Sequence, residues 1–96
     1  MKKLKNGSVF KLIYHKRSLK FLEKVSRDNA RYIIKKLENL QKNPMAKNAN
    51  VAKLAGEIEN AYRLRIGKIR VLYELDLENK AIYILNINYR GSIYKN

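Results

Sequence analysis

The sequence predicts an α+β domain in which two N-terminal helices pack on one face of a mostly antiparallel four-stranded sheet, in the chain order β-α-α-β-β-β. Three observations predict this fold. Apolar residues recur at helical spacing between residues 19 and 40, three β-rich runs occupy residues 61–88, and another β-rich run precedes the helices. Ninety-six residues, 46% of them apolar, suffice for one small core, so we expect residues 1–96 to form one domain.

The N-terminal half is predicted to contain one strand followed by two helices. Val9 to Tyr14 is rich in β-formers and reads as a strand. Ser18 is a suitable N-cap for a short helix that ends near Ser26, because apolar residues follow it at three-residue steps. Asp28 can cap a longer helix that stops at Pro44. Its buried stripe is predicted to consist of Ala30, Ile33, Ile34, Leu37 and Leu40.

The C-terminal half changes from helical to strand periodicity. Residues 45–56 are small, polar and aperiodic, so we expect a connection with at most one helical turn. Two strands, 61–66 and 69–75, then flank Gly67-Lys68, a two-residue loop whose leading glycine favours a type II′ turn. A second turn at 76–80 leads to a third strand at 81–88 and a short tail.

The predicted hairpin sorts its side chains into two faces. Residues that oppose one another across two strands share a face, and with Gly67-Lys68 as the loop Arg65 opposes Arg70. The face toward the helices collects Tyr62, Leu64, Ile66, Ile69, Val71, Tyr73 and Leu75. The other face collects Arg63, Arg65, Arg70, Leu72 and Glu74, so three guanidinium groups are expected to converge there.

Crowded arginines indicate an anionic ligand. Like charges placed directly across a strand pair are destabilising, and Glu74 alone offsets three cations on that face. Guanidinium groups bind phosphate oxygens in a planar, bidentate manner that lysine cannot match. The alternative is a solvated face that happens to be basic, although such a face would more often intersperse lysine and glutamate.

The composition narrows the function further. With 22 Lys+Arg against 8 Asp+Glu, the net charge is +14, which favours a nucleic acid or an acidic protein as partner. The absence of cysteine and the single histidine exclude thiolate zinc sites and cysteine nucleophiles and disfavour His-based triads, and we expect neither a metal nor a cofactor. No apolar run is long enough to span a bilayer and no signal-like block opens the chain, so we expect a cytoplasmic protein with no membrane partner.

The tail offers a second polar cluster. Asn86, Asn88 and Arg90 share strand parity, and Tyr94 can reach the same sheet edge if the tail folds back. A tyrosine beside cations has its phenolate form favoured and can transfer protons, although a tyrosine in this position is more often a packed terminal aromatic. His15 is expected to be a surface residue.

Several segments together resemble the RelE/ParE superfamily of toxins from toxin–antitoxin pairs. The most specific are YRLRIGKIRVLY at 62–73 and YRGSIY at 89–94, and the resemblance covers nearly the whole chain. It implies a RelE-like fold and, for the RelE-like branch, a metal-independent endoribonuclease that cuts mRNA in the ribosomal A site. In such enzymes the RNA's 2′-hydroxyl attacks the adjacent phosphorus, and an acidic antitoxin protein holds the toxin inactive.

The resemblance also implies site residues. The matching catalytic positions are Arg63, Arg65, Arg70, Arg90 and Tyr94, and Lys53, Lys68, Asn88 and Tyr89 are expected to contribute to RNA binding. Many relatives have lysine at the second-strand positions and His-Arg where this chain has Tyr89-Arg90. Because arginine cannot lose its proton, the general base is then Tyr94, a lysine such as Lys53 or Lys68, or the substrate itself. Two other readings stay open: a ParE-like toxin that inhibits DNA gyrase without cleaving RNA, and a decayed toxin that still binds RNA.

Overall fold

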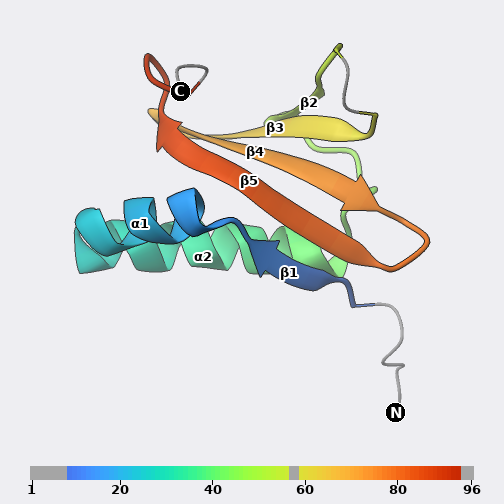
Figure 1. Cartoon of the computed structure of the whole chain (residues 1–96), viewed down its shortest axis with the longest axis horizontal. Coiled ribbons are helices and arrows are strands. Elements are labelled where there is room, and N and C mark those ends of the chain that lie inside the picture. The colour runs from blue at the N-terminus through green and yellow to red at the C-terminus, as the bar shows by residue number, and fades with distance from the viewer. Residues whose placement is uncertain (1–8, 57–58, 94–96) are drawn as a thin grey trace.

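The structure, a computed structural model that describes residues 9–56 and 59–93, has a five-stranded sheet with two helices on one face (Figure 1). The elements are β1 (Lys11–Tyr14), α1 (Lys16–Lys24), α2 (Arg27–Lys42), β2 (Val51–Lys53), β3 (Ala61–Ile66), β4 (Ile69–Asp76) and β5 (Ala81–Tyr89). The sheet order is β1-β5-β4-β3-β2, and only β1, which runs parallel to β5, departs from antiparallel pairing. The predicted α+β class and the position of the helices are confirmed.

The fifth strand, β2, lies inside the segment predicted to be a connection. Its three residues pair with β3 at the edge of the sheet, Val51 opposite Leu64 and Lys53 opposite Tyr62. Three residues are too few to show a strand periodicity in the sequence. Short edge strands of this kind are common because they leave few unpaired backbone groups for another chain to pair with. The prediction of four strands was therefore wrong by one.

Both helices begin earlier than the sequence predicts. His15 is the N-cap of α1, where its Nδ1 accepts a hydrogen bond from the Arg17 backbone N–H at 3.1 Å. Ser18, the predicted cap, is instead buried, and its Oγ donates to the Ile84 carbonyl at 3.0 Å, which fastens α1 to β5. Ser26 caps α2 by accepting from the Asn29 N–H at 3.1 Å, so Asp28 lies in the first turn and is not the cap.

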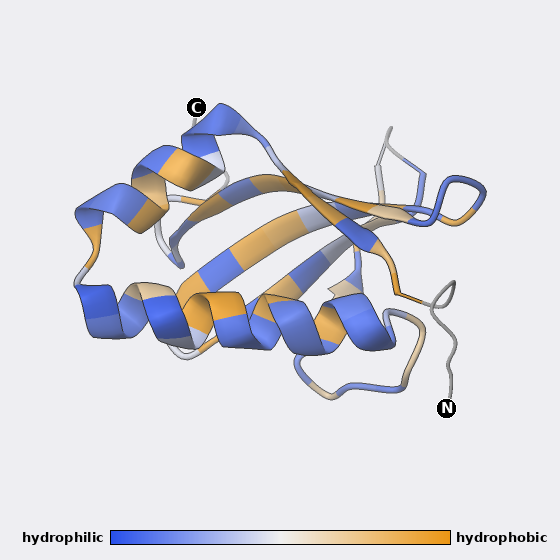
Figure 2. Cartoon of the chain, turned by 90° about the horizontal axis from the view of Figure 1, so that it is seen from below, coloured by the Kyte–Doolittle hydropathy of each residue, from blue (hydrophilic) through white to orange (hydrophobic). Residues whose placement is uncertain are grey.

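The core lies between α2 and the facing side of the sheet. The buried stripe of α2 consists of Ile33, Leu37 and Leu40, while Ala30 is only partly buried and Ile34 is exposed. Sheet residues that complete the core are Leu64, Ile66, Ile69, Val71, Tyr73, Leu75, Ile82, Ile84 and Ile87. Figure 2 shows the alternating apolar and polar bands along these strands behind the helices. Among the described residues no helix is long and apolar enough to cross a membrane.

Tyr73 is an unusual member of this core. Its side chain is fully buried and stacks on Tyr62 with 5.5 Å between ring centroids and 18° between ring planes. The Tyr73 hydroxyl has no hydrogen-bond partner among the described residues. Burial, and secondarily the neighbouring Tyr62, raises the pKa of this hydroxyl well above its usual range, so the group stays neutral in the folded protein.

Replacing this hydroxyl tests the cost of leaving it unpaired. Tyr73→Phe keeps the stacked ring and removes a buried polar group without a partner, so the free energy of unfolding should rise by about 1 kcal/mol. Urea denaturation followed by circular dichroism measures the change. The control is Tyr83→Phe, because Tyr83 lies on the opposite face of the sheet and is only partly buried. This control should change the free energy of unfolding by less than about 0.5 kcal/mol. A clear loss of stability in Tyr73→Phe would contradict the assignment.

The raised pKa of Tyr73 also predicts how stability depends on pH. Above pH 10.0, the usual pKa of the group, the unfolded chain releases the phenolic proton while folded Tyr73 retains it. Because the unfolded state then binds fewer protons, the free energy of unfolding should fall as the pH rises beyond this value. The fall should be shallower in Tyr73→Phe when urea denaturation is repeated between pH 9 and 11, and parallel curves would contradict the prediction.

Candidate nucleic-acid interface

The β3–β4 hairpin has the predicted register. Ile66 pairs with Ile69, Arg65 with Arg70, and Arg63 with Leu72. Gly67, the first residue of the turn, has a φ of 57°, and Lys68 is not among the residues with positive φ, as a type II′ turn requires. The three arginines consequently lie on the side of the sheet opposite the helices, here called the open face.

Two cross-strand rows organise the open face. One row contains Ala52, Arg63, Leu72 and Asn86, and the other contains Arg65, Arg70 and Asn88. Asn86 and Asn88 reach this face because of a β-bulge in β5: Tyr73 pairs with Ile84, but Leu72 pairs with Asn86. The extra residue, Leu85, reverses the alternation, so that both amides join the arginines instead of entering the core.

The guanidinium groups of Arg65 and Arg70 diverge. Arg70 is 9% exposed, and its Nη1 donates to the Gly67 carbonyl at 2.6 Å and to the Ile69 carbonyl at 3.1 Å. Arg65 is exposed and leans the other way, where its Nη2 donates to Asn50 Oδ1 at 3.1 Å. The two side chains share a face, but the expected convergence of three guanidinium groups was wrong for Arg70, which bends back onto the turn and relieves the repulsion.

Arg63 is held differently from the other two arginines. Its side chain is partly buried, and its Nε is buried without a hydrogen-bond partner among the described residues. The nearest carboxylate along the open face of β4 is that of Glu74, a diagonal neighbour of Arg63 by register. Glu74 lies four residues from Arg70, about 13 Å along the strand. The turn end of the open face is therefore strongly cationic.

The segment after β5 returns to this turn. The Arg90 N–H donates to the Lys68 carbonyl at 2.8 Å, which places these two predicted site residues beside each other at the backbone. Asn86 Nδ2 donates to the Ile93 carbonyl at 3.2 Å, and Ile93 is buried. The described part of the tail is thus anchored to the open face. Tyr94, the predicted proton-transfer residue, lies outside the described residues.

Two predicted site residues belong to the other side of the sheet. Lys53 pairs with Tyr62, and Tyr89 pairs with Ile69, so both have the parity of the helix-covered face. Tyr89 packs edge-on against Phe21 of α1, with 5.4 Å between ring centroids. The structure therefore brings Arg63, Arg65, Arg70 and Asn88 together, adds Lys68 and Arg90 at the turn, and leaves Lys53 and Tyr89 outside this group.

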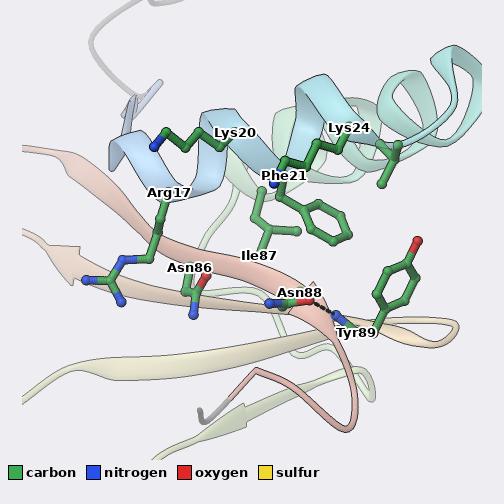
Figure 3. A pocket seen from close by; sticks show the side chains of 9 residues that line it. Arg17, Lys20, Phe21, Lys24, Asn86, Ile87, Asn88 and Tyr89 are labelled. Carbon is green, nitrogen blue, oxygen red and sulfur yellow. Dashed lines mark hydrogen bonds between the residues drawn. The ribbon is translucent and has the colours of Figure 1, made fainter. Parts of the chain in front are cut away.

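Sequence reasoning missed a groove beside the open face. It has a volume of about 640 Å³ and lies between α1 and the end of β5 (Figure 3). Its lining residues are Arg17, Lys20, Phe21, Lys24, Val25, Asn86, Ile87, Asn88 and Tyr89. The signal available in the sequence was the spacing of the three cations of the helix, which at steps of three and four residues place them on one helical face.

The bonds of Arg70 predict unequal effects on stability. Arg70→Ala removes two charge-assisted hydrogen bonds to the turn and should lower the free energy of unfolding by about 2 kcal/mol. Arg65→Ala, the exposed cross-strand partner, should change it by less than about 1 kcal/mol. Urea denaturation of both variants measures the difference, and equal losses would show that Arg70 does not hold the turn.

Comparison with known proteins finds relatives that match nearly the whole chain in sequence or in fold. A curated relative, the RelE1 toxin of Methanocaldococcus jannaschii, is 36% identical over 88 residues, covering 91% of this chain and 97% of the relative. The RelE–RelB complex of Pyrococcus horikoshii contains a chain with a TM-score of 0.75 and 28% identity, covering 88% of this chain and 98% of that one. The isolated Escherichia coli RelE toxin shares the fold, with a TM-score of 0.70, 22% identity and 83% of each chain covered.

The sequence profile of the family described as the ParE toxin of the type II toxin–antitoxin system parDE matches residues 12–94. This match spans every helix and strand of the structure apart from the first residue of β1. The chain therefore belongs to the ParE toxin family, within the RelE/ParE superfamily, and is a RelE-like toxin of a type II toxin–antitoxin system.

Proposed function

We propose that this toxin is an endoribonuclease that cleaves mRNA without a metal ion, at the ribosomal A site in the cytoplasm. The observation that carries the proposal is the gathering of Arg63, Arg65 and Asn88 on one open face, with Arg90 and Lys68 at its turn end. Such a face offers phosphate-binding cations together with an amide, which are the groups that bind an RNA backbone.

The proposed reaction takes its nucleophile from the RNA. The 2′-hydroxyl loses its proton to a base and attacks the adjacent phosphorus, and the bond to the 5′-oxygen breaks as that oxygen gains a proton. The products are a 2′,3′-cyclic phosphate and a 5′-hydroxyl. Negative charge builds up on the non-bridging oxygens during this step, and fixed guanidinium groups stabilise it without reorganising.

The residues have different roles in this proposal. Arg63 and Arg65 bind the scissile phosphate, and Arg90 supports them from the turn end. Arg70 donates to the turn carbonyls, so we assign it to positioning the hairpin as well as to the cationic field. Lys53 has the parity of the opposite face, which favours Tyr94 or Lys68 as the group that moves the proton.

The proposed protein partner is an acidic antitoxin. The net charge of +14 favours fast association with an acidic chain, and covering the open face would block RNA. Structures of relatives from Pyrococcus horikoshii and Methanococcus jannaschii are complexes of RelE with the antitoxin RelB, which supports the same arrangement here.

A second candidate function is inhibition of DNA gyrase without RNA cleavage. The observation that favours it is the profile match, since the matching family is described by its ParE toxin. The cations of the open face and its turn end, Arg63, Arg65, Arg90 and Lys68, favour the nuclease, because binding a protein target does not require phosphate-binding groups to gather in this way.

One experiment separates the two functions. Purified protein added to a translating extract should cleave mRNA to fragments with cyclic phosphate ends, and chelators should have no effect. Arg63→Ala should reduce the cleavage rate by at least tenfold, since a charged contact to the transition state contributes on the order of 2 kcal/mol. Tyr94→Phe should also reduce it by at least tenfold, because it removes a hydroxyl proposed to transfer the proton. Primer extension measures the rates, and Lys35→Ala on the exposed side of α2 is the control. Intact mRNA with loss of DNA supercoiling would identify the gyrase inhibitor instead.

A further inference from the structure

The groove between α1 and β5 lies along the edge of β5 that faces away from β4, where no described strand continues beyond β1. Strand β1 pairs with residues 81–84 of β5 and stops there, so the end of β5 faces α1 instead (Figure 3). Phe21 and Tyr89 form its apolar centre, and Tyr89 remains 49% exposed. A volume of about 640 Å³ lies within the range of sites that bind small molecules or parts of polymers.

The groove is cationic. Arg17, Lys20 and Lys24 line it from one face of α1, and none of the described residues that line it is acidic. The Arg17 guanidinium is oriented by its Nε, which donates to His15 Nδ1 at 3.3 Å. The charge of the groove therefore favours an anionic polymer, and we compare an acidic peptide strand with a nucleic acid.

The backbone of β5 disfavours a peptide strand. An added strand needs free backbone donors and acceptors along the edge it joins. Here the Ile84 carbonyl already accepts from His15 N–H at 2.9 Å and from Ser18 Oγ. The Tyr89 N–H donates to Asn88 Oδ1 at 2.8 Å, and the Tyr89 carbonyl accepts from Ser92 N–H at 2.9 Å. Both ends of the ladder that a peptide would use, at Ile84 and at Tyr89, are therefore occupied.

The side chains of the groove suit single-stranded RNA. Asn86 uses its amide NH₂ on Ile93, which leaves the Oδ1 as an acceptor, whereas Asn88 uses its Oδ1 on Tyr89, which leaves the NH₂ as a donor. An acceptor and a donor two residues apart can recognise a base edge, and a half-exposed tyrosine ring can stack on a base. Lysines one helical turn apart can follow the phosphates.

We propose that this groove binds the single-stranded RNA that flanks the scissile phosphate, with Lys20 and Lys24 on phosphates and the Tyr89 ring on a base. The row Arg65, Arg70 and Asn88 crosses three strands toward the groove, so one RNA strand can pass from the open face over β5 to α1. The span across those strands is about 10 Å. This inference rests on the proposed function, because it extends the RNA path of that site.

Binding of an RNA that cannot be cleaved tests the groove separately from catalysis. The probe is a fluorescein-labelled 12-nucleotide RNA of mixed sequence, 2′-O-methylated throughout, and anisotropy measures its affinity. The double reversal Lys20→Glu/Lys24→Glu should weaken binding at least tenfold and lower the slope of log affinity against log salt by about 1.4, the loss expected for two phosphate contacts. The matched control, Lys35→Glu/Lys42→Glu on the exposed side of α2, should weaken it less than threefold.

Two variants of Tyr89 test whether its ring stacks on a base. Tyr89→Ala should weaken binding about tenfold, while Tyr89→Phe, which keeps a ring, should retain wild-type affinity. Tyr32→Ala, which removes an exposed aromatic from α2, is the control for a general loss of aromatic surface. Circular dichroism checks that each variant is folded.

Cross-linking locates the RNA directly. The same RNA carrying 4-thiouridine should cross-link to peptides that contain Phe21 or Tyr89, and cross-links confined to residues 62–72 would overturn the inference.

Equal weakening of RNA binding by the two charge reversals would also overturn the inference, because it would show non-specific attraction. A peptide of alternating glutamate and phenylalanine that binds through Lys20 and Lys24 without competing with RNA would assign the groove to a protein partner. If the probe binds through the groove while unmodified mRNA stays intact, the proposed nuclease function fails and the groove assignment stands.

Discussion

The pairing of β3 with β4 through the Gly67-Lys68 turn is the constraint on which the rest of the molecule depends. Strand side chains alternate strictly, so a slip of one residue in one strand would turn its arginines into the core and its aliphatic residues into solvent. Gly67 allows the correct register without backbone strain, because its φ of 57° suits glycine better than any other residue. One turn therefore determines both where the core lies and where the cations gather.

The same pairing places Arg65 directly opposite Arg70, and the structure relieves the repulsion in an asymmetric way. Arg70 gives up exposure and donates to two carbonyl oxygens of the turn, while Arg65 remains in solvent beside Asn50. A buried guanidinium with carbonyl partners stabilises the hairpin, and an exposed one remains available to a ligand. The open face thus divides its cations between holding the turn and remaining exposed for the proposed phosphate contacts.

How far the sequence could predict the structure depends on how local each signal was. The register of the hairpin was predictable to the residue, because Gly67-Lys68 and the period-two pattern around it act within a dozen residues. The helix caps were not predictable in this way. The Ser18 hydroxyl donates to the Ile84 carbonyl, 66 residues away, and His15 caps α1 instead. Strand β2 was too short for its alternation to be recognised, and its pairing depends on β3. Within the site, the parity of the arginines followed from pairing alone, but the inward bend of Arg70 depends on turn carbonyls that no sequence pattern reports.

The bulge at Leu85 links the open face to the groove between α1 and β5. Ile82 and Ile84 face the helices, and without an extra residue Asn86 and Asn88 would follow them into the core unpaired. The step of three residues from Ile84 to Ile87 is the mark of this bulge in the sequence, since it returns an aliphatic residue to the core where alternation would place a polar one. After the bulge, the asparagines point to the arginine rows and Tyr89 points to α1. Because of this single inserted residue, the C-terminal end of β5 contributes to both surfaces. The open face and the groove are therefore continuous at Asn86 and Asn88.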